Sequence, residues 1–133
     1  MGITLGTIIS NSVNSLINSG YIVTGYNSNE VYLSDVNYFN VTWPEATLFY
    51  NRGYLEGSLF SAATPSFDMS RYNYLYSELT VKYGRPITTN TLSNGGLTCT
   101  WWGNGNSYLT LSYYPEYISG SGTFYFTTLA TGR

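Results

Sequence analysis

Two segments of the chain carry apolar residues at the spacing of an amphipathic α-helix. In the first, residues 8–21, the apolar positions fall three or four residues apart: Ile9, Val13, Leu16 and Ile17. Ser10 is a suitable N-cap, and Gly20 suits the left-handed conformation that ends many helices. The other positions are mostly Asn and Ser, which are weak helix formers, so we expect this helix to depend on packing.

The second helical segment, residues 66–86, has a stripe of aromatic and aliphatic residues: Tyr72, Leu75, Tyr76, Leu79 and Tyr83. Asp68 or Ser70 can cap its start, and Gly84 followed by Pro86 predicts its end. Aromatic residues at this spacing are typical of the buried side of a helix. We therefore expect the stripe to face a core rather than a cofactor.

The rest of the chain contains short segments rich in aromatic and β-branched residues, which are typical of strands. The predicted strands are residues 21–26, 30–35, 38–43, 46–51, 54–62, 97–102, 107–114 and 122–130. Asn51-Arg52-Gly53 predicts a tight turn in which Gly53 has a positive φ. Hairpins with helices set apart indicate an α+β domain, in which two helices pack on an antiparallel β-sheet.

The chain of 133 residues is long enough to bury a core, and we expect one domain over residues 1–133. Its two halves are nevertheless alike. Residues 16–24 and residues 81–89 each contain a helix end, a Gly and an extended segment, and strands rich in Trp and Tyr follow both. This likeness predicts two degenerate helix–strand repeats, approximately residues 1–66 and 67–133.

Residues 97–114 form a predicted hairpin whose register decides where its two adjacent tryptophans point. A two-residue turn would mix apolar and polar residues on both faces, whereas a three-residue loop, Asn104-Gly105-Asn106, separates them. One face then holds Leu97, Cys99, Trp101, Leu109, Leu111 and Tyr113, and the other holds Thr98, Thr100, Trp102, Tyr108, Thr110 and Ser112. Because a one-residue slip inverts every side chain, we expect the separated register, with Trp101 in the core and Trp102 outside.

The composition limits the classes of partner. Charged residues make up only 9% of the chain and aromatic residues 18%, with 15 tyrosines. The net charge is −2 and the basic residues are scattered, so we expect no nucleic-acid partner, which would require clustered cations. No apolar run approaches the roughly 18 residues that a membrane span needs, so we expect no span.

Candidate catalytic chemistry is sparse. The chain has no histidine, and its one cysteine, Cys99, lies in an alternating strand where a buried apolar role is expected. Zinc would need clustered Cys or His, and residues 26–35 lack the register of an EF-hand loop, so we predict no metal and no cofactor. Carboxylates remain as candidates for a glycosidase-type acid and base: Asp35, Glu45, Glu56, Asp68, Glu78 and Glu116. Glu45 and Glu56 lie on adjacent predicted strands but several positions apart, so we predict no catalytic residue.

The residues favour binding as the class of function. Tyr and Trp supply rigid contact area, and Asn, Ser and Thr supply hydrogen bonds, as they do in paratopes and in surfaces that stack on sugars. The predicted ligand-binding residues are Trp102, Tyr108, Thr100 and Thr110. The other interpretation is that aromatic residues favour strands and only cover the sheet.

Several of these segments together resemble a group of small exported proteins of gut bacteria. The resemblance rests on GTIISNSVNSLINSGY, VYLSDVNYFNVTWPEATLFYNRGYLEGSLFS, YLYSELTVKYGRP and TWWGNGNSYLTLSYY. The group's pattern is a Gly-led helix ending in Gly-Tyr, a W-x-x-x-x-F-x-F hairpin (here with Leu48 and Tyr50 at the Phe positions), an L-x-x-K-Y-G-x-P helix end and a W-x-x-G-N-x-x-(I/L)-T-L-S-Y strand pair. The resemblance implies tandem helix-on-sheet units, similar in style to the β-lactamase-inhibitor-protein fold and to small outer-membrane assembly lipoproteins. The group has no assigned activity, so it implies no functional residue.

We therefore predict a non-enzymatic binding or interaction module that recognises a protein or glycan ligand through a Tyr/Trp-rich face of its sheet. We expect a bacterial protein of the periplasm or the extracellular space, whose signal has been removed, and a cytoplasmic chain is the alternative. Two other functions stay open. One is a small carboxylate-dependent glycan hydrolase, and the other is a structural subunit whose aromatic face forms a homo-oligomer.

Overall fold

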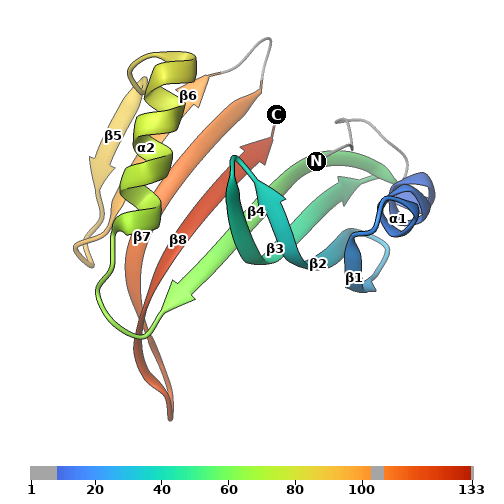
Figure 1. The fold of residues 1–133 in the computed structure, drawn as a ribbon, viewed down its shortest axis with the longest axis horizontal. Coiled ribbons are helices and arrows are strands. Elements are labelled where there is room, and N and C mark those ends of the chain that lie inside the picture. Colours follow the sequence, from blue (N-terminus) through green and yellow to red (C-terminus); the bar gives the residue numbers. More distant parts are fainter. Residues whose placement is uncertain (1–8, 103–106, 133) are drawn as a thin grey trace. The chain divides into compact units, whose positions relative to one another are not determined.

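The fold comes from a computed structural model that describes residues 9–102 and 107–132. Within these residues, two helices and an antiparallel sheet form a mixed α+β structure in which strand predominates (Figure 1). The predicted α+β class is confirmed at this level. The chain divides into two compact units, one that runs to Phe60 and one over Ser61–Thr131, and each is described by itself.

The first unit contains α1 (Ile9–Asn18), β1 (Ile22–Tyr26), β2 (Glu30–Tyr38), β3 (Val41–Asn51) and most of β4 (Tyr54–Thr64). Helix α1 confirms the first predicted helix, and Gly20 follows it with a φ of 89°. The backbone N–H of Tyr21 donates to the carbonyl of Leu16 at 3.0 Å, which satisfies one of the last helical carbonyls. The predicted N-cap is wrong, because α1 already includes Ile9 and Ser10 lies inside the helix.

A tight turn lies where the sequence predicts a strand over residues 38–43. Phe39 and Asn40 have φ angles of 54° and 59°, and they connect Tyr38 at the end of β2 to Val41 at the start of β3. Positive φ at both central residues is typical of a type I′ hairpin turn, whose twist matches that of the flanking strands. The strand prediction was therefore wrong at its centre.

Positive φ angles mark two other places in this unit. The turn predicted at residues 51–53 is confirmed, with Arg52 at φ 54° and Gly53 at φ 84°. Asp35 has a φ of 52° inside β2, where the register places it across from Pro44 of β3. The pairing passes from Ser34–Glu45 to Val36–Trp43 without a pair at this position, where proline has no N–H to donate. The alternation of buried residues shifts by one position in both strands at this point.

The core of the first unit is aliphatic and aromatic. Its buried residues are Leu16, Val31, Leu33, Val36, Trp43, Ala46, Leu48, Tyr50, Leu55 and Phe60. Trp43 is 0% exposed, and its Nε1 donates to the carbonyl of Tyr38 at 3.2 Å. Burial raises the pKa of the Tyr50 phenol, and the Ser12 hydroxyl acts in the opposite direction.

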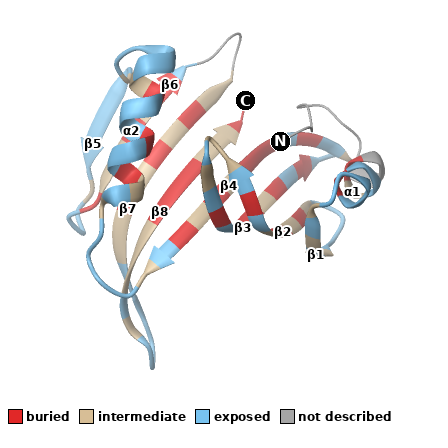
Figure 2. Ribbon diagram, viewed as in Figure 1, coloured by how far each residue is buried: buried red, intermediate tan, exposed pale blue. Residues whose placement is uncertain are grey.

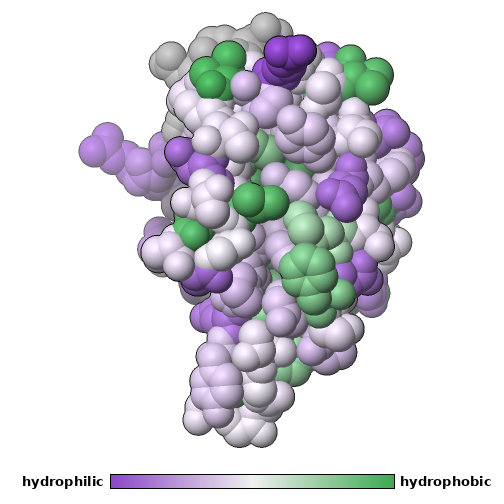
Figure 3. Space-filling view, turned by 90° about the vertical axis from the view of Figure 1, so that its left-hand side faces the viewer, coloured by the Kyte–Doolittle hydropathy of each residue, from purple (hydrophilic) through white to green (hydrophobic). Residues whose placement is uncertain are grey.

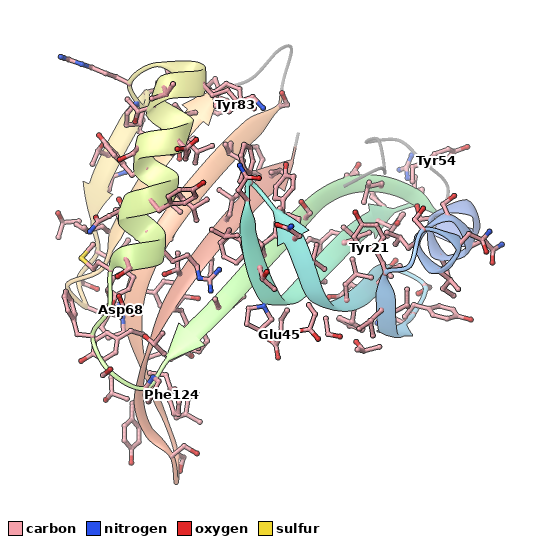
Figure 4. The ribbon with its side chains drawn as sticks, in the orientation of Figure 1. Tyr21, Glu45, Tyr54, Asp68, Tyr83 and Phe124 are labelled. Atoms are coloured by element: carbon pink, nitrogen blue, oxygen red, sulfur yellow. The ribbon has the colours of Figure 1, made fainter. Side chains whose placement is uncertain are left out.

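The second unit contains the end of β4 with α2 (Ser70–Tyr83), β5 (Thr88–Thr91), β6 (Leu97–Trp102), β7 (Tyr108–Ile118) and β8 (Gly122–Gly132). Helix α2 confirms the second predicted helix. Oδ1 of Asp68 accepts the backbone N–H of Ser70 at 2.9 Å, and the N–H of Gly84 donates to the carbonyl of Thr80 at 2.8 Å. Figure 4 shows Asp68 at the start of the helix and Tyr83 at its end.

The predicted stripe of α2 is buried only in part. Tyr72, Leu75 and Leu79 are buried, whereas Tyr76 and Tyr83 lie at the margin of the helix and are exposed.

No helix within the described residues is long and apolar enough to cross a membrane.

Hydrogen-bonded neighbours in the sheet follow the order β1-β2-β3-β4-β8-β7-β6-β5. The chain passes twice through the same series of elements, a helix followed by four strands. Strand β5 is not among the predicted strands, and Figure 2 shows it exposed along its length. The predicted repeats stay a prediction.

Candidate functional site

The β6–β7 hairpin has the predicted separated register. Trp102 pairs with Tyr108, and Trp101 pairs with Leu109. The loop over 104–106 that was predicted to set this register lies outside the described residues. The strand pairing itself confirms which side chains share a face, because directly paired residues of an antiparallel ladder point to the same side.

The inner face of the hairpin is covered by α2, which Figure 1 shows lying across β6 and β7. Cys99, Trp101, Leu109, Leu111 and Tyr113 are buried there, and Leu97 is half-buried. The Trp101 ring lies edge-on to Tyr76 of α2, with centroids 5.9 Å apart, and its Nε1 donates to the carbonyl of Gly84 at 2.8 Å. Trp101 is therefore a core residue, as predicted.

The opposite side of the hairpin carries the predicted ligand-binding residues. We name as the outer face the residues that share this side through direct pairing: Thr88, Asn90, Thr98, Thr100, Trp102, Tyr108, Thr110 and Ser112. Trp102 is 55% exposed, and its ring lies edge-on to that of Tyr108 at 6.4 Å between centroids. The two aromatic rings thus stand together at one end of the outer face.

Hydroxyl groups continue the outer face beyond the aromatic pair. The hydroxyls of Thr100 and Thr110 are 2.9 Å apart, and those of Thr98 and Ser112 are 3.0 Å apart. In each pair one hydroxyl donates to the other, so the second hydroxyl keeps its own O–H for a further acceptor. The outer face therefore offers donors and acceptors in regular rows.

The structure adds residues to this face that the sequence prediction missed. Strand β5 places Thr88 directly beside Thr100 and Asn90 beside Thr98, and both added residues are exposed. Tyr114 follows Ser112 by two positions in β7, which places it on the same side, and its ring stacks on Phe126 at 5.6 Å. The only sequence signal for β5 was the extended stretch after Gly84, which carries no aromatic or alternating pattern.

The outer face is uncharged, since its members are Thr, Ser, Asn, Tyr and Trp. Figure 3 shows the left-hand side of the view in Figure 1, where pale tints of intermediate hydropathy predominate and green, hydrophobic atoms lie among them. Ligand contacts to the outer face would depend on ring stacking and neutral hydrogen bonds rather than on ion pairs.

Cys99 lies on the buried side and not at the surface. Its Sγ is 3.5 Å from the hydroxyl of Tyr72, with α2 above it. Burial raises the pKa of the Cys99 thiol, and burial also raises the pKa of the Tyr72 phenol. The thiol is thus held in its protonated, weakly nucleophilic form.

The six candidate carboxylates are exposed, and Figure 4 shows Glu45 and Asp68 on separate elements. Glu45 pairs with Ser34 across the β2–β3 ladder, and Oε1 of Glu56 accepts from Nδ2 of Asn51 at 3.2 Å. The hydroxyl and backbone N–H of Ser70 lower the pKa of Asp68, whose carboxylate bonds to the first residue of α2. The predicted cap at Asp68 or Ser70 is wrong, because Met69 occupies the N-cap position. Over residues 9–102 and 107–132, no three Cys, Asp or Glu side chains are grouped so that they could hold a metal ion.

Comparison with protein-family models, with curated proteins and with solved structures found no match. The function of the protein is therefore inferred from its own residues. The predicted ligand-binding residues all lie on the outer face.

Proposed function

We propose that the protein is a non-enzymatic binding module of the bacterial cell envelope or the extracellular space, and that its outer face recognises a protein or glycan ligand. The observation that carries this proposal is the exposed Trp102 ring, which stands beside Tyr108 at the end of a row of hydroxyls. What supports a binding role is the grouping of this exposed indole with a second ring and with neutral hydroxyls on one face, because such a group combines stacking area with hydrogen-bonding atoms.

The chemistry of the outer face suits a neutral ligand. Aromatic rings pack against the apolar C–H faces of sugars or against apolar side chains, and the adjacent hydroxyls can bond to the ligand's hydroxyls or amides. Because the face carries no charge, affinity should change little with ionic strength. The low charged fraction of 9% and the resemblance to small exported proteins support the placement in the envelope or outside the cell.

We further propose that the two units are degenerate repeats, each with its helix packed on its own strands. The repeated order of one helix and four strands supports this arrangement. So do the buried helix residues Leu16 in α1 and Leu75 and Leu79 in α2. In this proposal the outer face is a specialisation of the second repeat.

A glycan array and a pull-down from envelope extracts would first supply a ligand, and isothermal titration would then compare variants. Trp102→Ala should weaken binding at least about tenfold, because an anchoring aromatic residue is removed. Thr100→Val should weaken it less. The matched control is Tyr117→Ala, because Tyr117 is a 71% exposed aromatic residue of the same strand, β7, and lies beyond Tyr113, where the pairing with β6 ends.

The proposal would be overturned if neither assay found a ligand, or if Trp102→Ala and Tyr117→Ala had equal effects. Shortening of a bound glycan over time would instead indicate the hydrolase. Concentration-dependent assembly that Trp102→Ala abolished would indicate an oligomer formed through the aromatic face.

A further inference from the structure

Within residues 9–102 and 107–132, β5 is a terminal strand of the sheet, so one side of its backbone has no neighbouring strand there. The N–H of Leu92 donates to the carbonyl of Gly96, which fixes the phase of the β5–β6 ladder. The backbone N–H and C=O groups of successive residues point to opposite edges of a strand, so those of Thr88 and Asn90 point toward β6. The N–H and C=O groups of Thr89 and Thr91 therefore point outward from the edge.

Apart from its short length of four residues, this edge lacks the features that usually prevent strand addition. Residues 87–96 contain no charged residue and no proline, and all four residues of β5 are exposed. The other terminal strand, β1, differs, because its pairing with β2 shifts between Val23 and Gly25 and α1 packs against it. The two edges of the sheet are thus unequal, and β5 is the one open to pairing.

We propose that β5 pairs antiparallel with β5 of a second copy of this chain, about a two-fold axis through Asn90. In this register Thr89 lies opposite the partner subunit's Thr91, and the outward backbone groups of both residues meet. A two-fold interface needs a strand that complements itself, and the neutral Thr-Thr-Asn-Thr sequence meets that condition without like-charge repulsion.

The pairing would also join the two outer faces. Asn90 lies on the outer face, and residues paired directly across an antiparallel ladder share a side. Two copies would therefore present one continuous surface for ligand. The pairing itself does not depend on a ligand, so its test is separate from that of the proposed function.

Sedimentation velocity over micromolar to millimolar concentrations should show a monomer–dimer equilibrium, because a strand of four residues gives a weak interface. Hydrogen exchange followed by NMR should slow at the Thr89 and Thr91 amides as the concentration rises. A chain that stays monomeric throughout, or amides that do not respond, would overturn the proposal.

A charge swap tests the register. Thr89→Lys with Thr91→Lys places like charges opposite each other and should abolish the dimer, whereas Thr89→Lys with Thr91→Glu places opposite charges together and should restore it. The control is Ser119→Lys with Ser121→Lys, which adds the same charge in the β7–β8 turn and should leave the dimer intact. Circular dichroism verifies that each variant is folded. A dimer that survives the double-lysine change, or one that the Lys/Glu pair does not restore, contradicts the proposed pairing.

Discussion

The adjacent residues Trp101 and Trp102 should differ sharply in their contribution to stability, because consecutive residues of a strand point to opposite faces. Trp101 is 2% exposed and Trp102 is 55% exposed. A fully buried Trp removes about 200 Å² from water, worth about 5 kcal/mol at about 25 cal/mol per Å². Trp102, with slightly less than half of its surface buried, contributes about 2 kcal/mol on the same scale, and both values are upper estimates.

Trp101→Ala also leaves the carbonyl of Gly84 without its indole donor, which adds a cost of about 1 kcal/mol. We therefore expect Trp101→Ala to lower the free energy of unfolding by about 4 kcal/mol more than Trp102→Ala. Trp101→Phe, which keeps a buried ring but loses the N–H, should fall between them. Urea denaturation followed by far-UV circular dichroism would measure all three, with m-values compared to verify two-state unfolding.

Equal losses from the two alanine variants would refute the assignment of the two faces. A larger loss from Trp102→Ala would mean that the strand register is inverted, and the outer face would then not exist as described. Because the two residues are neighbours, any general effect of the hairpin on stability is common to both variants.

Three other outcomes follow from the contacts of the second unit. Gly96→Ala should destabilise the protein by about 1–3 kcal/mol in urea denaturation, because a Cβ there would lie 2.7 Å from the carbonyl oxygen of Tyr113. An unchanged stability would mean that the backbone of β7 moves away at little cost. Cys99 should react with a thiol reagent only at the rate of unfolding, and immediate labelling of the native protein would contradict its burial. Asp68→Asn should lower the thermal midpoint at neutral pH. Because the folded pKa of Asp68 is depressed, the difference from the parent protein should have its full size above about pH 4. The difference should shrink as the pH falls through the lower pKa of the folded state. A loss that persisted unchanged in acid would show that the carboxylate charge does not matter.

Much of the fold followed from the sequence, because its signals are local. The stripe of α2 repeats at helical spacing, and Gly84 is a strong stop signal. The β6–β7 register followed from one physical condition, the separation of apolar from polar residues, since any other register would have exposed part of the core.

The failures have equally specific causes. Phe39 and Asn40 adopt positive φ although neither is glycine, so the turn carries no Asn-Gly or Asp-Gly signal. The short polar strand β5 is stabilised by its pairing with β6, and its Thr and Asn residues give no local sequence signal for that pairing. Thr88 and Asn90 were missed from the candidate site for the same reason.

The unequal exposure of the three tryptophans gives the protein a built-in optical probe. Trp43 and Trp101 lie in the cores of the two units, while Trp102 stands in solvent. Acrylamide should quench the emission of Trp102 selectively, and the quenchable, red-shifted component should disappear in Trp102→Ala. A ligand seated on the outer face would shield the same component and shift it to the blue. Binding could then be followed in unlabelled protein.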